Sequence, residues 1–322
     1  MEQPDTKQLI SVIIPVYNRE NNVLETLNSL VEQTYRPIEL ILVDNGSTDG
    51  SLEICRKFQT RYDQPAFRVI VTETLRHGAN AARNKGFKLS SGDYLLFFDS
   101  DDRWYPDSLS IIFSNLYKHH FPEAIAFSFL LRFPDGHVSR RPHHHSSSPA
   151  EQLFDPVLST HNVCLRRSLF IRIGLWNEQL IRWQDLEFGF RILKNVRRLY
   201  WIKGAPLYEV SVHQDSISGK TYSSDFEALS SSLESIQQLV ETMPSGRTSD
   251  HLQRALCFKK CSVAAQIRLE QQTDRSAEEL YQTAVSQLPT SRDKLSRSIL
   301  WLHFWYSGRG GRGFWRLARK FL

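Results

Sequence analysis

Three aspartates crowd into four residues of the stretch FFDSDDRWYPD. Asp99, Asp101 and Asp102 follow an apolar run that is typical of a buried strand. Like charges at this spacing repel each other unless something neutralises them, and a divalent cation with oxygen ligands is the usual agent. The stretch therefore predicts a cation site. An acid-rich helix N-terminus just before Pro106 is the alternative.

Two more polar pairs stand directly after apolar runs. The stretch SVIIPVYNRE leads through Pro15 to Tyr17 and Asn18, and LILVDNGSTDG leads to Asp44 and Asn45. In parallel sheets, ligands bind at the carboxyl ends of the strands. These side chains and the three aspartates are therefore expected at one binding edge.

The segments that must position these residues alternate between strand and helix. Strands are predicted from the apolar, β-branched runs, and helices from apolar residues at helical spacing between them. The strands are expected at 9–17, 38–44, 67–73 and 93–98, and the helices at 21–34, 51–62 and 78–92. This alternation predicts an α/β fold with a mainly parallel central sheet and helices on both faces.

Composition limits the class of protein. The 322 residues with 41% hydrophobic content predict one large domain with an appendage. The net charge of +5 suits nucleic acid, an anionic membrane surface or a phosphate-bearing substrate, without distinguishing them. The polar N-terminus does not resemble a signal peptide, and the chain lacks an apolar run of about 20 residues, which argues against a membrane span.

The three stretches, in their order and at their separations, resemble the nucleotide-sugar-binding half of the family 2 glycosyltransferases, which have the Rossmann-like GT-A fold. The resemblance continues through CLRRSLFIRIGLWNEQLIRWQDLEFGFRI to VHQDSIS. It implies a GT-A domain over residues 1–222, with a nucleotide-binding half at about 8–105 and an acceptor half at about 106–222. Residues 223–322 are expected to form a C-terminal helical region.

The resemblance assigns residues to the nucleotide-sugar donor. Tyr17 would lay its ring on a pyrimidine base, and Asp44 and Asn45 would contact the base edge. The family usually has a second aspartate at the position of Asn45, so both UDP and dTDP remain open. Arg83 would contact a phosphate or be a solvated helix residue. The full donor-binding set is Pro15, Tyr17, Asn18, Asp44, Asn45, Arg83 and Asp99.

The resemblance also implies a divalent metal, Mn²⁺ or Mg²⁺, that bridges the diphosphate. Asp101 would bind it, and Asp99 would hold the ribose or help to position the metal. His213 corresponds to a histidine that many members bring to the metal or diphosphate, with a structural histidine as the alternative. The role of a second cluster, formed by His143, His144 and His145, is left open.

The acceptor half carries the candidate base. Asp185 stands in the apolar stretch IRWQDLEFGFRI, where the family has an aspartate that deprotonates the acceptor hydroxyl. A helix cap is the alternative role, which is compatible with the first. Glu187, two residues further along a helix, points elsewhere and is the less suitable base.

These parts imply an inverting, metal-dependent hexosyltransferase of cell-envelope polysaccharide or glycolipid assembly, with a saccharide or lipid-linked acceptor and no nucleic acid. Two alternatives remain. A nucleotidyltransferase would carry a glycine-rich loop after the first strand, where PVYNRENN has no glycine. A catalytically silent nucleotide-sugar-binding protein would keep the donor site and lack turnover.

The C-terminal region is expected to be helical, and its end is both aromatic and basic. The stretch ILWLHFWYSGRGGRGFWRLARKFL, residues 299–322, interleaves aromatic side chains with Arg309, Arg312, Arg316, Arg319 and Lys320. Such a segment is typical of an interfacial helix on anionic lipid, and a helix packed on the domain is the alternative. The expected protein is cytoplasmic. It is peripheral at the inner face of the membrane under the first interpretation of this segment and not under the second.

Overall fold

The computed structural model describes residues 7–140, 145–212, 221–271, 275–289 and 294–322. The chain packs as two compact units. The first unit comprises residues 1–145, 158–179 and 195–214, and the second comprises residues 146–157, 180–194 and 215–322. The sequence-based division cuts the chain once, at residue 222, whereas the two packing units take alternate segments of the chain.

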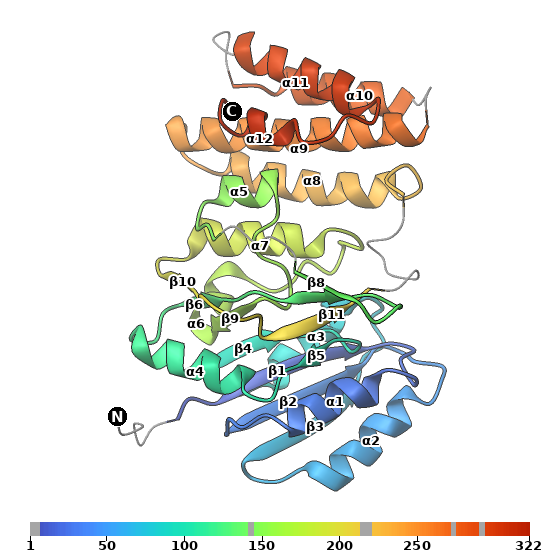
Figure 1. Ribbon diagram of the computed structural model, residues 1–322, viewed down its shortest axis with the longest axis vertical. Helices are drawn as coiled ribbons and strands as arrows, with labels where there is room; N and C mark the ends of the chain where they lie inside the picture. The colour runs from blue at the N-terminus through green and yellow to red at the C-terminus, as the bar shows by residue number, and fades with distance from the viewer. Residues whose placement is uncertain (1–6, 141–144, 213–220, 272–274, 290–293) are drawn as a thin grey trace. The chain divides into compact units, whose positions relative to one another are not determined.

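A seven-stranded sheet lies at the centre of the first unit (Figure 1). Its order is β10-β6-β9-β4-β1-β2-β3, with β1 parallel to β2 and β4, and β2 parallel to β3. Strand β9 is antiparallel to both β4 and β6. The strands are β1 Ile10–Val16, β2 Ile38–Asp44, β3 Phe67–Glu73, β4 Tyr94–Phe97, β6 Ala124–Ala126, β9 Val163–Arg166 and β10 Leu199–Trp201. The predicted α/β fold with a mainly parallel sheet is confirmed.

Helices cover both faces of this sheet because its strands are apolar on both sides. Alternate residues of β1, such as Val12 and Ile14, join the core with α1, α2 and α4, while α3 and α6 pack on the other face. The helices are α1 Val23–Val31, α2 Ser51–Tyr62, α3 Ala79–Leu89, α4 Ser108–Lys118 and α6 Arg167–Ile173.

A second, four-stranded sheet belongs to the same unit. Its order is β5-β11-β7-β8, with β5 Arg103–Trp104, β7 Leu130–Arg132, β8 Val138–Arg140 and β11 Tyr208–Ser211. The end of β11 reaches the aspartate cluster, since the hydroxyl of Ser211 donates to the carbonyl of Asp101 at 2.6 Å. This small sheet therefore supports the turn that follows β4.

Helix α3 approaches the sheet closely at Gly86. A Cβ atom at this position would stand 2.4 Å from Cγ2 of Ile13 and 3.2 Å from Cγ2 of Val43. Both neighbours are β-branched residues of buried strands, whose side chains have little freedom to move away. The missing side chain at Gly86 thus sets the distance between α3 and the sheet.

We expect Gly86→Ala to destabilise the protein. Alanine in a helix usually adds about 0.5–1 kcal/mol over glycine, but overpacking a tight core costs about 1–3 kcal/mol. The net change in the free energy of unfolding should therefore be a loss of about 1–2 kcal/mol, measured by urea denaturation. Lys85→Ala, at an exposed position of the same helix, is the control and should be nearly neutral. Unchanged or increased stability of Gly86→Ala would show that α3 can move away.

The second unit is helical. Its elements are α5 Pro149–Phe154, α7 Gln184–Asn195, α8 Phe226–Glu241, α9 Arg247–Glu270, α10 Arg275–Ser286, α11 Lys294–Ser307 and α12 Trp315–Ala318. Helix α9 is central, since α5, α8, α10 and α11 all pack against it. Its buried face includes Leu256, Phe258 and Ile267. The predicted C-terminal helices are therefore present. Among the described residues, none of the helices combines the length and the apolar character needed to cross a bilayer.

Helix α11 carries a buried histidine. His303 is 6% exposed, its ring nitrogens pair with the hydroxyls of Ser262 and Ser307 at 2.9 and 3.1 Å, and its ring lies 4.4 Å from that of Phe258. Burial lowers the pKa of His303 to about 4, from an ordinary value of 6.5. The folded chain therefore keeps this ring neutral over a pH range in which the unfolded chain protonates it.

This difference predicts a loss of stability in mild acid. Because the folded-state pKa is depressed, the contribution is complete above about pH 6.5 and is lost as the pH falls toward about 4, with an upper bound of about 3 kcal/mol. His303→Gln keeps polar atoms but cannot titrate. We expect urea denaturation at several pH values to show the wild type losing more stability than His303→Gln across this window, while His77→Gln, at an exposed position, follows the wild type. Parallel curves for all three proteins would contradict the prediction.

Candidate active site

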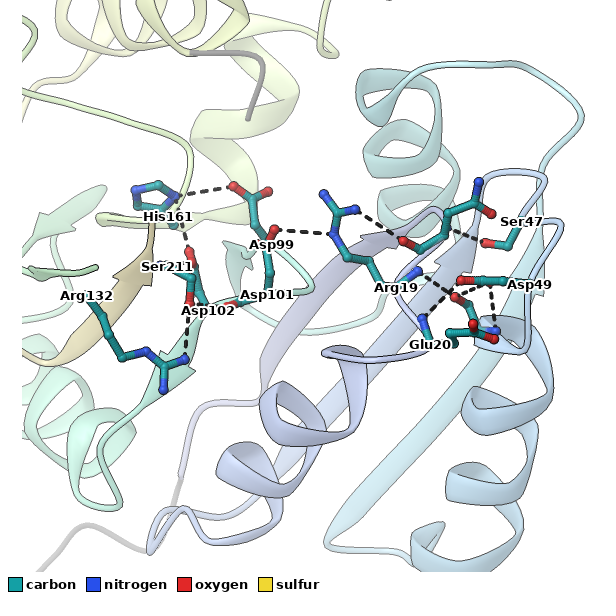
Figure 2. Close-up of polar contacts among 12 residues, drawn as sticks. Arg19, Glu20, Ser47, Asp49, Asp99, Asp101, Asp102, Arg132, His161 and Ser211 are labelled. Carbon is teal, nitrogen blue, oxygen red and sulfur yellow. Dashed lines mark hydrogen bonds and ion pairs between the residues drawn. The ribbon is translucent and has the colours of Figure 1, made fainter. Parts of the chain in front are cut away.

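The loops after β1 and β2 are joined by hydrogen bonds. Asn18 adopts a left-handed backbone with φ 49°, which asparagine tolerates better than most residues. Its N–H donates to Oγ of Ser47 at 3.1 Å, and its Oδ1 accepts from the N–H of Thr48 at 2.8 Å. Next to it, the N–H of Glu20 donates to Asp49 (Figure 2). Tyr17 stands beside these bonds with 53% of its surface exposed, so its ring is available to a ligand.

Pro15 is accommodated by the end of the neighbouring strand. It pairs in register with Val43 of β2, but the pairing of β1 with β4 ends at Ile13 and Phe97. A proline within a strand normally breaks a ladder because it lacks an N–H. Since β4 has already stopped, β1 extends past it and projects the loop with Tyr17 from the sheet edge.

The carboxylate of Asp44 is buried, and its two oxygens have different environments. Oδ2 accepts from the N–H groups of Gly46 and Ser47, both at 3.0 Å, and so shapes the turn. Oδ1 is also buried and has no hydrogen-bond partner in the described structure. A buried acceptor without a partner carries a desolvation cost, which a ligand N–H would remove.

Asn45 bridges two loops. Its Nδ2 donates to the carbonyl of Arg76 at 2.6 Å, and its Oδ1 accepts from the N–H of Gly78 at 2.7 Å. The amide therefore ties the loop after β2 to the loop before α3. The structure gives this residue a supporting role within the protein.

Arg83 is buried rather than solvated. Its Nη2 donates to Oδ1 of Asp99 at 2.9 Å, its Nη1 donates to Asn80 at 3.0 Å, and its guanidinium lies 4.9 Å from the centre of the Trp176 ring. These contacts hold the arginine beneath Asp99. Its observed partner is thus a carboxylate of the site.

A cluster forms where Asp99 and Asp102 meet His161. Oδ2 of Asp99 lies 3.5 Å and Oδ2 of Asp102 lies 3.8 Å from Nδ1 of His161. Figure 2 draws both contacts as dashed lines. The imidazole stands edge-on to the rings of Phe129 and Tyr208, with centroids 5.2 and 5.5 Å away. One ligand atom from each of the three residues lies within 4.8 Å of the others.

The electrostatics of the two aspartates differ. Burial by itself raises the pKa of Asp99, but His161 and the guanidinium of Arg83 outweigh it and hold this pKa well below its usual range. Burial raises the pKa of Asp102 well above its usual range, and the carboxylates of Asp99 and Asp101 raise it further. The charge of Arg132 lowers the pKa of Asp102 only in part, so burial and the two carboxylates prevail.

The cluster fits a cation. Oδ2 of Asp102 and Nδ1 of His161 are buried without a hydrogen-bond partner, although Oδ1 of Asp102 accepts from the N–H of Ser211 at 3.0 Å. Carboxylates suit Mg²⁺ and Mn²⁺, while an imidazole nitrogen favours a transition metal. The donor set therefore fits Mn²⁺ better than Mg²⁺.

Asp101 points in a different direction from its neighbours. Its Oδ2 lies 3.3 Å from Nε of Arg19, which comes from the loop after β1. This ion pair links the acidic turn to the loop that carries Tyr17 (Figure 2). Among the described residues, the group of possible metal ligands contains Asp99, Asp102 and His161 and does not include Asp101.

The sequence predicts Asp102 as part of an acidic cation site but gives the metal to Asp101, and it points to no role for His161. His161 stands just before β9, whereas the other polar residues of the site follow strands. Because β9 is antiparallel to β4, its beginning lies at the edge where β4 ends. The sequence carried no signal of this reversal, so the histidine had no link to the aspartates.

The candidate base belongs to the second unit. Asp185 is half-buried in the first turn of α7, two residues after Trp183, whose backbone has φ 52°. Glu187 is buried and paired with Arg191, with Oε1 2.7 Å from Nε. A left-handed conformation is costly for a bulky residue, and such strain often accompanies functional sites. Of the two acids, Asp185 has the more accessible carboxylate.

The remaining histidines divide between described and undescribed segments. His213, His143 and His144 lie outside the described residues. The ring of His145 stacks on Trp201 at 4.8 Å with an interplanar angle of 9°. Burial lowers the pKa of His145, as do the charges of Lys203 and Arg140. This histidine therefore packs against β10.

Comparisons with solved structures show the fold. The chain is similar to S. aureus TarS 1–349 in complex with UDP-GlcNAc, with a TM-score of 0.69 and 18% identity over 97% of this chain and 90% of that one. It is also similar to the mannosyltransferase PcManGT from Pyrobaculum calidifontis in complex with GDP-Man and Mn²⁺, with a TM-score of 0.58 and 15% identity over 94% and 86% of the two chains. The expected GT-A fold is confirmed.

Sequence comparisons show the family. AmsB of Erwinia amylovora, an amylovoran biosynthesis glycosyltransferase, is 31% identical over 190 residues, which are 56% of this chain and 62% of AmsB. The chain spans 15–62% of the length of the first curated relatives that it matches. The family model described as glycosyl transferase family 2 matches residues 11–175. The chain belongs to glycosyl transferase family 2.

Proposed function

We propose that the protein is an inverting glycosyltransferase that moves a sugar from a UDP- or dTDP-sugar to an acceptor hydroxyl. One observation carries the proposal. Where β4 ends and β9 begins lies an Asp-Asp-His cluster. The neighbouring strands β1 and β2 end in an exposed tyrosine ring and a buried carboxylate oxygen without a partner. These groups match a diphosphate with its cation, the face of a base and the edge of a base.

The pyrimidine would bind at Tyr17 and Asp44. The exposed ring of Tyr17 offers a stacking surface, and Oδ1 of Asp44 accepts the N3–H that uracil and thymine share. Asn45 supports this site indirectly, because its amide is hydrogen-bonded to the segment 76–78 and so holds the loop after β2 in place. The UDP-GlcNAc complex of TarS supports a UDP-sugar as donor.

We assign the metal to Asp99, Asp102 and His161, with Arg83 holding Asp99 in place. When bound, a divalent cation would neutralise the charge that develops on the leaving diphosphate. The Mn²⁺ complex of PcManGT supports this chemistry. Asp101, the ligand that the family resemblance implies, is the alternative and would have to leave Arg19 to serve. The assignment of His213 to the metal or diphosphate stays an expectation.

Asp185 is proposed as the general base. It would take the proton of the acceptor hydroxyl as the acceptor oxygen bonds to the anomeric carbon on the face opposite the nucleotide. The bond from that carbon to the phosphate oxygen breaks, and its electron pair leaves with the nucleoside diphosphate. A single displacement inverts the configuration and requires no covalent intermediate. Orientation of the reactants can supply about 7–11 kcal/mol of the barrier reduction.

The acceptor is proposed to be a growing saccharide of the cell envelope, free or lipid-linked. The name of AmsB, an amylovoran biosynthesis glycosyltransferase, supports a polysaccharide.

Asp185→Asn tests the base and the activity together. The amide keeps the shape of the side chain but accepts protons poorly, so donor binding should persist while turnover falls by about 10²–10⁴. Nucleotide release is measured from UDP- and dTDP-sugars with Mn²⁺, with GDP-mannose as the purine control. Donor binding is followed by thermal shift. Absence of release by the wild type from every sugar nucleotide would overturn the enzyme assignment.

Glu187→Gln is the matched control. It removes one partner of a buried ion pair and leaves Arg191 short of its counter-charge, which typically costs about 3–5 kcal/mol of stability. We expect a lower melting temperature with turnover per folded molecule largely retained. Full activity of Asp185→Asn with loss in folded Glu187→Gln would move the base to Glu187.

The metal assignment separates two sets of ligands. Thermal shift and Mn²⁺ binding are measured with the metal alone, so that the outcome does not depend on turnover. We expect His161→Ala and Asp102→Asn to lose Mn²⁺ binding by at least about tenfold, since loss of even an outer-shell partner of a metal ligand costs about 10–100-fold in affinity. Asp101→Ala should bind Mn²⁺ nearly as tightly as the wild type.

The opposite pattern would give the site to Asp101 instead. His120→Ala, at an exposed position, controls for non-specific loss of a histidine. A wild type that binds neither Mn²⁺ nor Mg²⁺, with or without UDP, would remove the metal from the proposal and leave the base-binding contacts to be tested separately.

A further inference from the structure

Helix α11 is apolar on both faces. Its inner face contributes Ile299, Leu300 and Phe304 to the core of the second unit. Its outer face exposes five large apolar side chains, each between 43% and 58% accessible: Leu295, Trp301, Leu302, Trp305 and Tyr306. The exposed positions of α11 also include Lys294, Arg297 and Ser298. A group of five exposed apolar side chains of this size nevertheless marks an interaction site, so a partner is expected for this outer face.

The exposed side chains form a continuous surface. The rings of Trp301 and Trp305 lie 6.5 Å apart at an angle of 21°. Beside them is a depression of about 430 Å³ lined by Tyr281, Arg297, Ser298, Trp301 and Leu302. None of these five residues is acidic. We call this surface, formed by the five exposed side chains of α11 and this depression, the α11 surface.

The chain from α11 to the C-terminus carries charge of one sign. Residues 294–322 contain seven lysines and arginines and no aspartate or glutamate: Lys294, Arg297, Arg309, Arg312, Arg316, Arg319 and Lys320. Arg309 lies over the ring of Trp305 at 4.4 Å, which places a cation beside the aromatic surface. Arg319 is paired with Glu151. The α11 surface is thus aromatic and carries the cations Arg297 and Arg309, while Glu278 of α10 acts on Tyr281 at the other side of the depression.

The terminal segment itself is largely packed. Helix α12 has four residues, Ala318 and Leu322 are buried, and the carbonyl of Leu322 pairs with His251 at 3.0 Å. Much of the segment from α12 to Leu322 therefore packs on the second unit, as the alternative interpretation of a docking helix predicts. The exposed aromatic side chains belong mainly to α11, which lies before residue 309.

We propose that the α11 surface binds an anionic lipid bilayer. Tryptophan and tyrosine favour the membrane interface, where the ring is buried and the polar N–H or O–H stays hydrated. Arginines beside them gain attraction to anionic headgroups, by about fivefold in affinity for each cation near the surface. This combination is that of a helix lying in the interface plane.

Charge argues against a second copy of the chain as the occupant. A symmetric dimer places the same patch of each copy against the other. The arginines at 297 and 309 would then meet a partner surface that is equally basic. Anionic lipid supplies the opposite charge that this surface needs.

Vesicle binding tests the proposal with the full-length chain. We expect sedimentation with vesicles of 70% phosphatidylcholine and 30% phosphatidylglycerol at low salt, weaker binding at 0.5 M NaCl, and little binding to pure phosphatidylcholine. Trp301→Ser with Trp305→Ser should reduce partitioning at least tenfold, and Arg297→Gln with Arg309→Gln should reduce it on anionic vesicles. The exposure of these side chains predicts unchanged melting temperatures.

Two exposed positions of the first unit supply controls. Leu75→Ser removes an apolar side chain and Arg61→Gln removes a cation, both at exposed positions, and neither should change vesicle binding. A wild type that ignores anionic vesicles, or a double tryptophan variant that binds like the wild type, would overturn the proposal. So would a concentration-dependent dimer that the tryptophan substitutions dissolve, because the surface would then belong to a second copy.

Lipid binding does not require transferase chemistry. A chain that binds vesicles but releases no nucleotide would leave this inference standing while the proposed function fails. If the tryptophan substitutions raised the KM for a soluble polymer acceptor without changing vesicle binding, the surface would be assigned to the acceptor.

Discussion

Three carboxylates within four residues at the end of a buried strand must each find a partner, because their mutual repulsion would otherwise destabilise the turn. The structure supplies a different one to each. Asp99 bonds to Arg83 from α3, Asp101 pairs with Arg19 from the loop after β1, and Asp102 accepts from the backbone of Ser211 in β11. The cluster is therefore where a helix, a loop and the small sheet meet around β4. In these three contacts, Asp99 and Asp101 are each paired with an arginine, whereas Asp102 is paired with a backbone N–H. The ring of His161 lies 3.8 Å from the other oxygen of Asp102.

Much of this edge could be predicted from the sequence. The apolar runs gave β1, β2 and β3 nearly their observed bounds, because parallel strands buried on both faces leave a continuous apolar signal. The polar residues that follow them then had to lie at one edge. His161 could not be found in this way, since it precedes an antiparallel strand, and strand direction is set by pairing far along the chain. The hydrogen bonds of Asn45 to residues 76–78 could not be predicted either, because these partners are distant in sequence. Its contact with the base edge, which the family resemblance implies, stays a prediction.

The helical part shows a similar limit. Periodicity predicted the C-terminal helices, but it carries no information on which other segments join them. Helix α5 and residues 184–194 come from the first 222 residues, yet they belong to the second unit. The reason is that Phe154, Leu186 and Phe190 lie in the core that this unit shares with the C-terminal helices. The amphipathic pattern near the C-terminus was also ambiguous. The amino-acid composition of a helix face does not reveal whether that face packs against the core or is exposed to solvent. Helix α11 has an apolar face of each kind.

Oδ1 of Asp44, the carboxylate oxygen without a hydrogen-bond partner, affects which nucleotides can compete for the proposed donor site. A carboxylate accepts hydrogen bonds and donates none, and cytosine presents a bare ring nitrogen where uracil and thymine present N3–H. In the proposed site, a cytidine nucleotide would place the N3 acceptor of cytosine against Oδ1 of Asp44, which is also an acceptor and is buried. Sites that are built to pair with one ligand hydrogen reject an analogue lacking it far more strongly than a hydrophobic pocket rejects a missing methylene. A single buried oxygen would thus keep the enzyme from being occupied by cytidine diphosphates in a cell that contains many nucleotides.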